Sequence, residues 1–375
     1  MITSASFAIT SRTKHTGDSM GKTIHRVLLY RLGSLGDTLV ALPALHLVAR
    51  AFPAADRRLL TNFPVNVKAP PAAAVLEHTG LVHGFFRYAV GTRSPSSLLS
   101  LWWQLVRWRP DVLVYLGAPR GIDSAKRDAL FFRLCGIATQ IGVPVTEDGQ
   151  RNRLVGPDQA LEPEASRLAR NIADLGPAHL DDPASWDLHL TAAEHKRAQE
   201  VLAPAAGLPL IVAGVGTKVQ AKDWGRDNWR ALLTRVAALY PGHALALCGA
   251  PEERESSDFA AADWAAASAG SPVLNLCGTL SPRESAAVIA RARIFLGPDS
   301  GPMHLAASVQ IPCVAIFAAR NIPRVWFPYG PQHRVLYHNV DCAGCGLETC
   351  IVQRRKCLAS ITVDEVLTAI ATILH

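Results

Sequence analysis

RVLLYRLGSLGD, residues 26–37, is an apolar run that passes through a glycine-rich turn to an acidic residue. The run Arg26–Arg31 predicts a buried strand, and the periodicity of Thr38–Ala51 predicts a helix after the turn. Pro43 is tolerated there because the first turn of a helix does not need its backbone N–H. A strand, a glycine-rich turn and a helix in this order are typical of nucleotide-binding α/β domains.

The alternation of apolar runs and helical patterns continues along the chain and predicts parallel α/β architecture. We expect two such halves, residues 23–190 and 207–360, with a cleft between them, and a closing helix in residues 361–375. Residues 1–22 lack the apolar centre of a signal peptide, so we interpret them as a disordered leader or as a mis-assigned start before Met20. Further strands are expected at residues 111–116, 208–215, 243–248, 294–296 and 313–317, and further helices at residues 163–175, 228–240, 281–292, 301–309 and 363–374. The helix at residues 281–292 opens with Ser281 and Glu284 in the spacing of a capping box.

Composition is that of a globular protein: 49% of the 375 residues are hydrophobic and 18% are charged. No uncharged apolar run is long enough for a transmembrane helix. Residues 24–155 hold 16 Lys and Arg against 8 Asp and Glu, whereas residues 156–375 hold 19 against 22. A basic first half indicates an anionic partner, such as a phosphorylated glycan, an acidic lipid or nucleic acid, although mild basicity also serves solubility alone.

The first candidate site is the turn that follows the first predicted strand. Gly33, Ser34 and Gly36 lie where a ligand of an open α/β sheet approaches the backbone. Asp37 begins the next helix and is a candidate general base for an attacking hydroxyl. An acidic residue at this position also serves simply as a helix cap.

The second candidate site follows the strand expected at residues 208–215. Gly216 and Thr217 form a turn there, and Thr217 can donate a hydrogen bond to a phosphate. Lys222 is a candidate for neutralising a departing diphosphate, with a solvated surface lysine as the ordinary alternative.

The third candidate site follows the strand expected at residues 294–296. Asp299, Ser300 and Gly301 open a helix whose N–H groups and dipole attract phosphate. His304 lies in the first turn of that helix, within reach of a phosphate or ribose. The ordinary alternative is a capped helix with a buried core histidine.

In order and spacing these segments, above all DSGPMHLAA at residues 299–307, resemble the ADP-heptose:lipopolysaccharide heptosyltransferases of glycosyltransferase family 9. The resemblance implies the GT-B fold, in which an N-terminal Rossmann-like domain binds the acceptor and a C-terminal one binds a nucleotide sugar, typically ADP-L-glycero-β-D-manno-heptose. It also implies inverting transfer without a metal or other cofactor. By matching position, Asp37 resembles the general base, Lys222 the phosphate-binding lysine and Asp299 the acidic residue at the donor sugar, with Ser300, Gly301 and His304 in the donor loop.

Two positions on the donor side depart from the family pattern. Ala318–Asn321 stands where many members have a Gly-Pro-Thr turn, and Gly225 follows Trp224 where proline is frequent. These departures leave the identity of the donor sugar open.

Two further segments each have two readings. Four cysteines spaced C-x2-C-x4-C-x6-C are either a structural zinc site or free thiols and disulfides without a metal: Cys342, Cys345, Cys350 and Cys357. An amphipathic basic stretch either packs as an ordinary helix or lies on an anionic membrane surface: Trp102, Trp103, Arg107, Trp108 and Arg109.

We therefore expect a cytoplasmic glycosyltransferase of lipopolysaccharide assembly, with or without peripheral contact to the inner membrane. Its partners would be a nucleotide sugar and an anionic lipid-linked glycan, and not nucleic acid. One alternative is a GT-B transferase or epimerase that uses another nucleotide sugar. A second alternative is a non-catalytic nucleotide- or nucleic-acid-binding protein, for which we find no helix-turn-helix, zinc-finger spacing or aromatic RNA platform.

Overall fold

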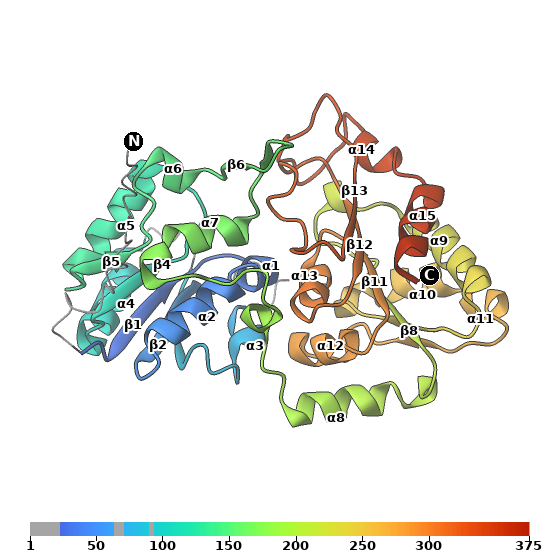
Figure 1. The fold of residues 1–375 in the computed structure, drawn as a ribbon, viewed down its shortest axis with the longest axis horizontal. Helices are drawn as coiled ribbons and strands as arrows, with labels where there is room; N and C mark the ends of the chain where they lie inside the picture. The colour runs from blue at the N-terminus through green and yellow to red at the C-terminus, as the bar shows by residue number, and fades with distance from the viewer. Residues whose placement is uncertain (1–22, 64–70, 90–93, 375) are drawn as a thin grey trace, which may run out of the picture.

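Two α/β domains lie side by side in the computed structural model, which describes residues 23–63, 71–89 and 94–374 (Figure 1). The leader at residues 1–22 lies outside the described residues. The first sheet has the strand order β3-β2-β1-β4-β5 and the second the order β10-β9-β8-β11-β12-β13, with parallel pairing throughout. In both sheets the first strand of the domain lies in the interior and the order reverses beside it, which is the Rossmann arrangement. The predicted α/β fold is confirmed.

The first domain is built from β1 (Arg26–Tyr30), α1 (Leu35–Leu39), α2 (Leu42–Ala51), β2 (Asp56–Asn62), α3 (Ala73–Leu76), β3 (Gly84–Tyr88), α4 (Pro95–Trp108), β4 (Val112–Tyr115), α5 (Ile122–Leu134) and β5 (Thr139–Ile141). The chain then passes through α6 (Glu147–Gln150), the hairpin β6 (Leu154–Val155) and β7 (Ala160–Leu161), α7 (Glu164–Asn171) and α8 (Ala192–Val201).

The second domain comprises β8 (Leu210–Ala213), α9 (Arg226–Leu239), β9 (Ala244–Leu247), α10 (Arg254–Ala261), α11 (Trp264–Ala267), β10 (Val273–Asn275), α12 (Pro282–Ile289), β11 (Ile294–Pro298), α13 (Gly301–Ser308), β12 (Cys313–Phe317), β13 (Arg334–Tyr337), α14 (Lys356–Ala359) and α15 (Val363–Leu374). Short 3-10 helices fill several of the connections, among them η4 (Gln220–Lys222) and η5 (Pro251–Glu253). The closing helix α15 packs against α9, β12 and β13 and so belongs to the core of this domain. No helix of the described residues is both long and apolar enough to cross a bilayer.

The central strands are continuous apolar runs because helices cover both faces of a parallel sheet. Every residue of β4, β8, β9, β11 and β12 is buried. These strands and β1 are the ones that the apolar runs predict, and each begins and ends within two residues of the expected bounds. The strand expected at residues 294–296 continues to Pro298, so its end reaches the edge of the cleft.

The single helix expected over Thr38–Ala51 is wrong, because the structure has two helices there. α1 ends at Leu39 and α2 begins at Leu42, with Pro43 in its first turn. A proline inside one continuous helix would lack its N–H bond and clash with the carbonyl four residues earlier. The break lets α1 stand alone at the end of β1, facing the second domain.

Five strands of the two parallel sheets were not predicted: β2, β3, β5, β10 and β13. β2 shows why, since its sequence DRRLLTN begins with three charged residues and lacks an apolar run. Arg57 is nevertheless only 5% exposed, and its guanidinium donates hydrogen bonds to the carbonyls of Gly80, Leu81 and Phe52. The sequence alone does not distinguish a buried arginine, whose guanidinium is bonded to backbone oxygens, from an arginine on the surface.

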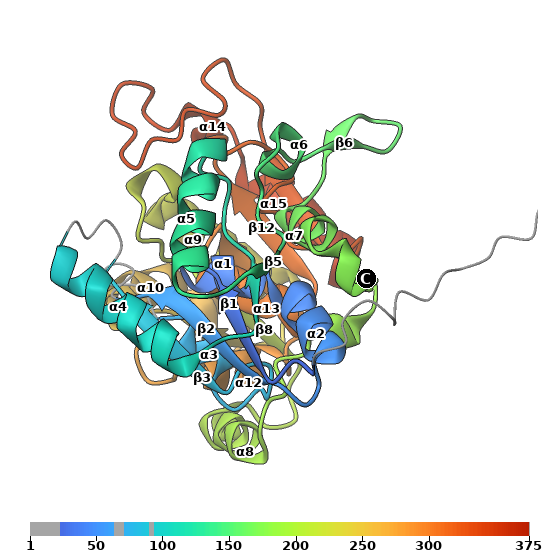
Figure 2. The ribbon, with the colours of Figure 1, turned by 90° about the vertical axis from the view of Figure 1, so that its left-hand side faces the viewer.

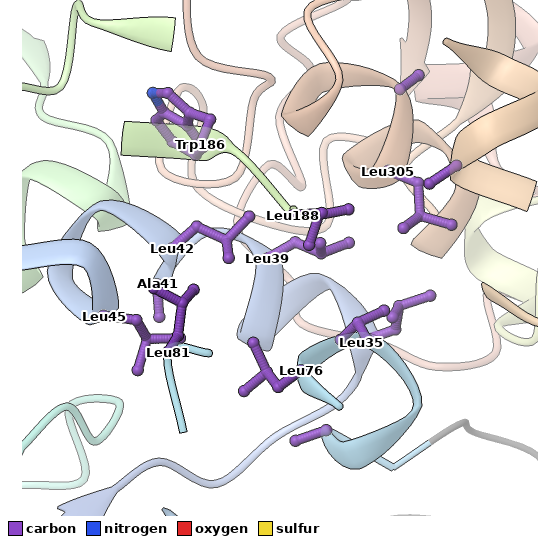
Figure 3. Packing of buried hydrophobic residues seen from close by; sticks show 14 of the residues in the cluster. Leu35, Leu39, Ala41, Leu42, Leu45, Leu76, Leu81, Trp186, Leu188 and Leu305 are labelled. Atoms are coloured by element: carbon purple, nitrogen blue, oxygen red, sulfur yellow. The ribbon is translucent and has the colours of Figure 1, made fainter. Parts of the chain in front are cut away.

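One buried apolar cluster contains residues of both domains and fixes their relative position (Figure 3). Leu35 and Leu39 of α1 and Leu76 of α3 belong to it together with Leu305 of α13. Leu188, in the connection between the domains, belongs to the same cluster. Burial of these side chains stabilises the pairing at about 25 cal/mol per Å² of apolar surface removed from water.

One arginine of the second domain bonds to the first domain and to the connection. Arg283 on α12 is 3% exposed, and its guanidinium donates to the carbonyls of Val75, Leu188 and His189 at 2.9–3.0 Å. It also forms a forked ion pair with Glu194 at 2.5 and 3.0 Å. The capping box predicted at the start of α12 is present, with Ser281 and Glu284 bonded reciprocally.

Candidate active site

A cavity of about 1030 Å³ lies where the two domains face each other. Its walls come from the start of α1, from the segments that follow β8, β9 and β11, and from α12. These segments follow the carboxyl ends of parallel strands, and β1 and β8 are the strands beside which the sheet order reverses. Ligands of doubly wound sheets bind at this location. A cavity of this size can hold a nucleotide sugar.

Asp37 lies on the first-domain wall of the cavity, together with Ser34 and Gly36. Its Oδ2 accepts hydrogen bonds of 2.7 Å from both the backbone N–H and the hydroxyl of Ser34. Its Oδ1 lies 3.8 Å from a guanidinium nitrogen of Arg31, and the side chain is 25% exposed. Asp37 therefore has both predicted properties: it caps α1, and it presents a carboxylate to the cavity.

Gly33 does not line the cavity but shapes the turn that holds Asp37. Its φ is +137°, which disfavours any side chain, and a Cβ there would overlap the Asp37 side chain. Its N–H donates to Asn62 Oδ1 at 2.8 Å, at the end of the neighbouring strand. The turn is thus fixed from β2 as well as from β1.

On the second-domain wall, Lys222, Asp299 and His304 form a row of charged and polar groups. Lys222 Nζ lies 2.6 Å from Asp299 Oδ2, and His304 Nε2 lies 3.8 Å from Asp299 Oδ1. Burial of Asp299 opposes ionisation, but His304 and Lys222 outweigh that effect and hold the pKa of this carboxyl below its usual range. The three side chains are at most 17% exposed, so their charges are only weakly screened by solvent.

The start of α13 adds hydrogen-bond donors to this wall. Ser300 is the N-cap, and Gly301 is the first helical residue; both line the cavity. The first N–H groups of a helix have no partner within the helix and attract anions. Ser300 Oγ is buried and has no hydrogen-bond partner among the described residues, so it is available to a ligand.

Two glycines bring the domains into close contact at the cavity. A Cβ on Gly36 would lie 2.7 Å from His304 Cδ2, and a Cβ on Gly301 would lie 2.7 Å from Leu35 Cδ2. Neither distance is compatible with a side chain at the glycine unless a neighbour moves. The starts of α1 and α13 therefore meet across the domain boundary because both positions lack a Cβ.

Thr217 also lines the cavity, and its hydroxyl accepts a 3.3 Å hydrogen bond from the backbone N–H of Val219. Gly216 was predicted to bind the donor directly, but it does not line the cavity. A Cβ on Gly216 or on Gly249 would overlap the side chain of Glu253. These two glycines leave room for that carboxylate between the ends of β8 and β9.

Glu253 is one of the cavity residues that were not predicted from the sequence. It lines the cavity, its Oε2 accepts a 2.9 Å hydrogen bond from the Ala250 N–H, and burial raises the pKa of its carboxyl. Its position shortly after the second strand of a Rossmann domain was an available clue, because an acidic residue there commonly meets a ribose. The surrounding sequence PEERE is so rich in charge that one buried acid does not stand out.

None of the four clustered cysteines lines this cavity. Among the residues that the structure describes, no three His, Cys, Asp or Glu side chains are grouped as a metal site. Cys357 is buried in the second-domain core, Cys345 is exposed, and Cys350 Sγ accepts a 3.3 Å hydrogen bond from the Arg355 N–H. The reading of these cysteines as thiols, disulfides or zinc ligands stays a prediction.

Two facing Rossmann-like domains with a cavity between their switch points define the GT-B class. A sequence model of glycosyltransferase family 9 (heptosyltransferase) matches residues 164–355, just over half of the chain. The protein belongs to this family.

Individual relatives agree with this assignment. The chain is 30% identical over 216 residues to lipopolysaccharide heptosyltransferase 1 of Pseudomonas aeruginosa. The aligned segment covers 52% of this chain and 56% of that protein. It spans about half the length of that relative, and less of the other curated relatives it matches.

Solved structures share the fold over nearly the whole chain. The family 9 glycosyltransferase of Veillonella parvula superposes with a TM-score of 0.69 at 17% identity, covering 95% of this chain and 99% of that one. Escherichia coli heptosyltransferase WaaC with ADP-2-deoxy-2-fluoro heptose gives a TM-score of 0.58 at 20% identity, covering 92% and 99%. The predicted GT-B fold and family are confirmed.

Proposed function

We propose that the protein is an inverting, metal-independent glycosyltransferase that moves heptose from ADP-L-glycero-β-D-manno-heptose onto a lipopolysaccharide core or related glycan. One observation carries the proposal: a single cavity places the carboxylate of Asp37 opposite the row formed by Lys222, Asp299 and His304. Family membership supports sugar transfer over epimerisation and over non-catalytic binding. The ADP-2-deoxy-2-fluoro heptose that accompanies E. coli WaaC, a protein of the same fold, supports the choice of donor.

In the proposed reaction, the acceptor hydroxyl oxygen bonds to the anomeric carbon while the bond from that carbon to the diphosphate breaks. The hydroxyl proton passes to Asp37 as general base. Ser34 holds Oδ2 with two hydrogen bonds, so we assign the proton to Oδ1. A single in-line displacement of this kind inverts the anomeric configuration.

Lys222 and the start of α13 stabilise the negative charge that develops on the leaving ADP. Lys222 bonds to Asp299, which holds the ammonium at the cavity wall. The unpartnered hydroxyl of Ser300 donates to a phosphate oxygen in this arrangement. These groups supply the positive charge that a metal would otherwise provide.

Glu253 completes the donor site as the acceptor of hydrogen bonds from the ribose hydroxyls. Its carboxylate lies between the ends of β8 and β9, where the ribose of a Rossmann-bound nucleotide lies. The acceptor then enters from the first domain, whose residues 24–155 carry the excess of Lys and Arg. Phosphates and carboxylates of a lipopolysaccharide core match this charge.

The test is a transfer assay with ADP-heptose and a heptose-free lipopolysaccharide core, read by the mass of the glycan and by ADP release. We expect ADP and extended glycan in equal amounts, inverted configuration at the new anomeric centre, and undiminished turnover in EDTA. ADP release without an extended glycan would contradict transfer. Loss of turnover in EDTA that Mg²⁺ restores, with an unchanged circular dichroism spectrum, would contradict metal independence.

A further inference from the structure

Helices α4 and α5 form the outer side of the first domain, turned away from the second domain (Figures 1 and 2). They are in contact, because the Trp102 indole N–H donates a 3.0 Å hydrogen bond to the Leu134 carbonyl. Trp102, predicted as part of an amphipathic stretch, is half-buried between the helices. The ordinary reading of that stretch as helix packing therefore accounts for Trp102 but leaves Trp103 unexplained.

Each helix presents an exposed row at the spacing of successive turns. On α4 the row is Leu99, Trp103 and Arg107, where Leu99 is 63% and Trp103 59% exposed. On α5 the row is Lys126, Leu130 and Leu134, where Leu130 is 57% and Leu134 66% exposed. We call these six residues the outer face. Four large apolar side chains exposed on two touching helices are more than scattered surface residues and mark an interaction surface.

Cations border the apolar part of the outer face. Besides Arg107 and Lys126, the exposed side chains of Arg127 and Arg133 lie on α5. α4 contains no acidic residue. α5 contains Asp123 and Asp128, and Asp128 is ion-paired with Arg120 and lies 3.9 Å from Arg127.

We propose that the outer face binds the surface of an anionic phospholipid bilayer. Leucines enter the boundary between headgroups and acyl chains, Trp103 occupies the headgroup level that indoles prefer, and the bordering cations meet lipid phosphates. A second copy of the chain is a poorer occupant, because a two-fold contact would place the same cations against each other. The charge complementarity of the patch thus favours lipid over self-association.

Bilayer binding goes beyond the proposed sugar transfer and requires neither donor nor acceptor. Its consequence for that reaction is that the enzyme would be held at the surface where a lipid-linked acceptor resides. Vesicle binding and transfer can therefore succeed or fail separately in experiments.

The experiment is co-sedimentation of the full chain with vesicles of phosphatidylglycerol and phosphatidylcholine, or of phosphatidylcholine alone. We expect binding to the anionic vesicles that weakens with salt, and little binding to the neutral ones. Replacing Leu99 and Trp103 by serine should lower the partition coefficient at least about tenfold, because both side chains lose apolar burial. The pair Arg107→Gln and Arg133→Gln should lower it about fivefold for each cation removed.

Leu239→Ser is the matched control, because Leu239 is 60% exposed but lies at the end of α9 in the second domain. It should bind vesicles as the wild type does. Donor-induced thermal stabilisation, measured on every variant, reports that the fold is intact. Equal binding to neutral vesicles, no effect of the serine variants, or dimerisation in solution that those variants abolish would each overturn the proposal.

Discussion

The two domains share the order of five strands but present different groups to the cavity. In the first domain the segment after β1 ends in the carboxylate of Asp37, whereas in the second domain the segments after β8 and β11 present Lys222 and the start of α13. The second-domain wall also carries the carboxylates of Asp299 and Glu253, so Lys222 is a local cation in a half that is net negative, just as Asp37 is a local anion in a half that is net positive. Individual residues therefore determine the reacting groups at the cavity. The net charge of a domain acts at longer range, on an approaching charged substrate.

Neutralising the first-domain carboxylate is the strongest test of the difference between the two walls of the cavity. Asp37→Asn keeps an oxygen that can accept from Ser34 and so preserves the helix cap. We expect a fall in kcat of about 10²- to 10⁴-fold, the usual result of losing a general base, with ADP binding unchanged by calorimetry. Ser34→Ala removes the hydroxyl bond to Oδ2 but keeps the carboxylate, and so shows how much of the fall arises from that bond. Near-native turnover of Asp37→Asn would show that the carboxylate serves only the cap.

Removing the second-domain cation is expected to have the next largest effect. Lys222→Ala removes the ammonium that lies 2.6 Å from Asp299 and should lower kcat about 10²- to 10³-fold, as loss of one charge-stabilising donor does. It also leaves Asp299 buried without its nearest cation, so thermal stability is measured in parallel. Lys222→Ala with Asp299→Asn separates the two effects by removing the unpaired charge. If the double variant recovered both stability and full turnover, Lys222 would have no role in catalysis.

The contact between the domains is tested by filling the space beside Gly36. Gly36→Ala puts a methyl group where His304 already lies, and we expect a loss of about 1–3 kcal/mol of stability, seen as a lower melting temperature. Alanine otherwise favours a helix, so the loss reports the contact and not the backbone. Gly36→Ala with His304→Ala should recover most of the loss. Strictly additive effects of the two changes would mean that the helix starts do not touch in solution.

The smallest expected effect concerns long-range charge. Added salt should raise the KM for an anionic acceptor several-fold more than the KM for the donor, because attraction over about 8 Å or more is screened at physiological salt while short contacts persist. Charge reversal of exposed first-domain arginines should mimic the salt effect. Steady-state constants for both substrates at low and high salt provide the measurement. An equal or larger effect on the donor would contradict the division of labour between the domains.

Sequence reasoning succeeded where a local pattern decides the structure. The apolar runs predicted β1, β8 and β12, and Ser281 with Glu284 predicted the start of α12. It failed where the outcome depends on a distant partner. Arg57 makes β2 look like a loop, because its charge is satisfied by carbonyls from other segments.

The candidate site divides in the same way. Glycine-rich turns and helix starts identified Asp37, Ser300 and Gly301 one by one, and all three line the cavity. The bond between Lys222 and Asp299 joins residues 77 positions apart, and no local pattern specifies it. Glu253 becomes recognisable only once Gly216 and Gly249 are seen to leave space for its side chain.

Arg283 has a consequence for how a substrate reaches this cavity. Its guanidinium bonds to the first domain through Val75, to the connection through Leu188 and His189, and to α8 through Glu194. One of these five hydrogen bonds, to the Val75 carbonyl, reaches the first domain, and the other four hold α12 to the connection and to α8. A rotation that parts the helix starts at Gly36 and Gly301 while keeping these bonds would have to turn about Arg283. Hinge rotations of domains generally take microseconds to milliseconds.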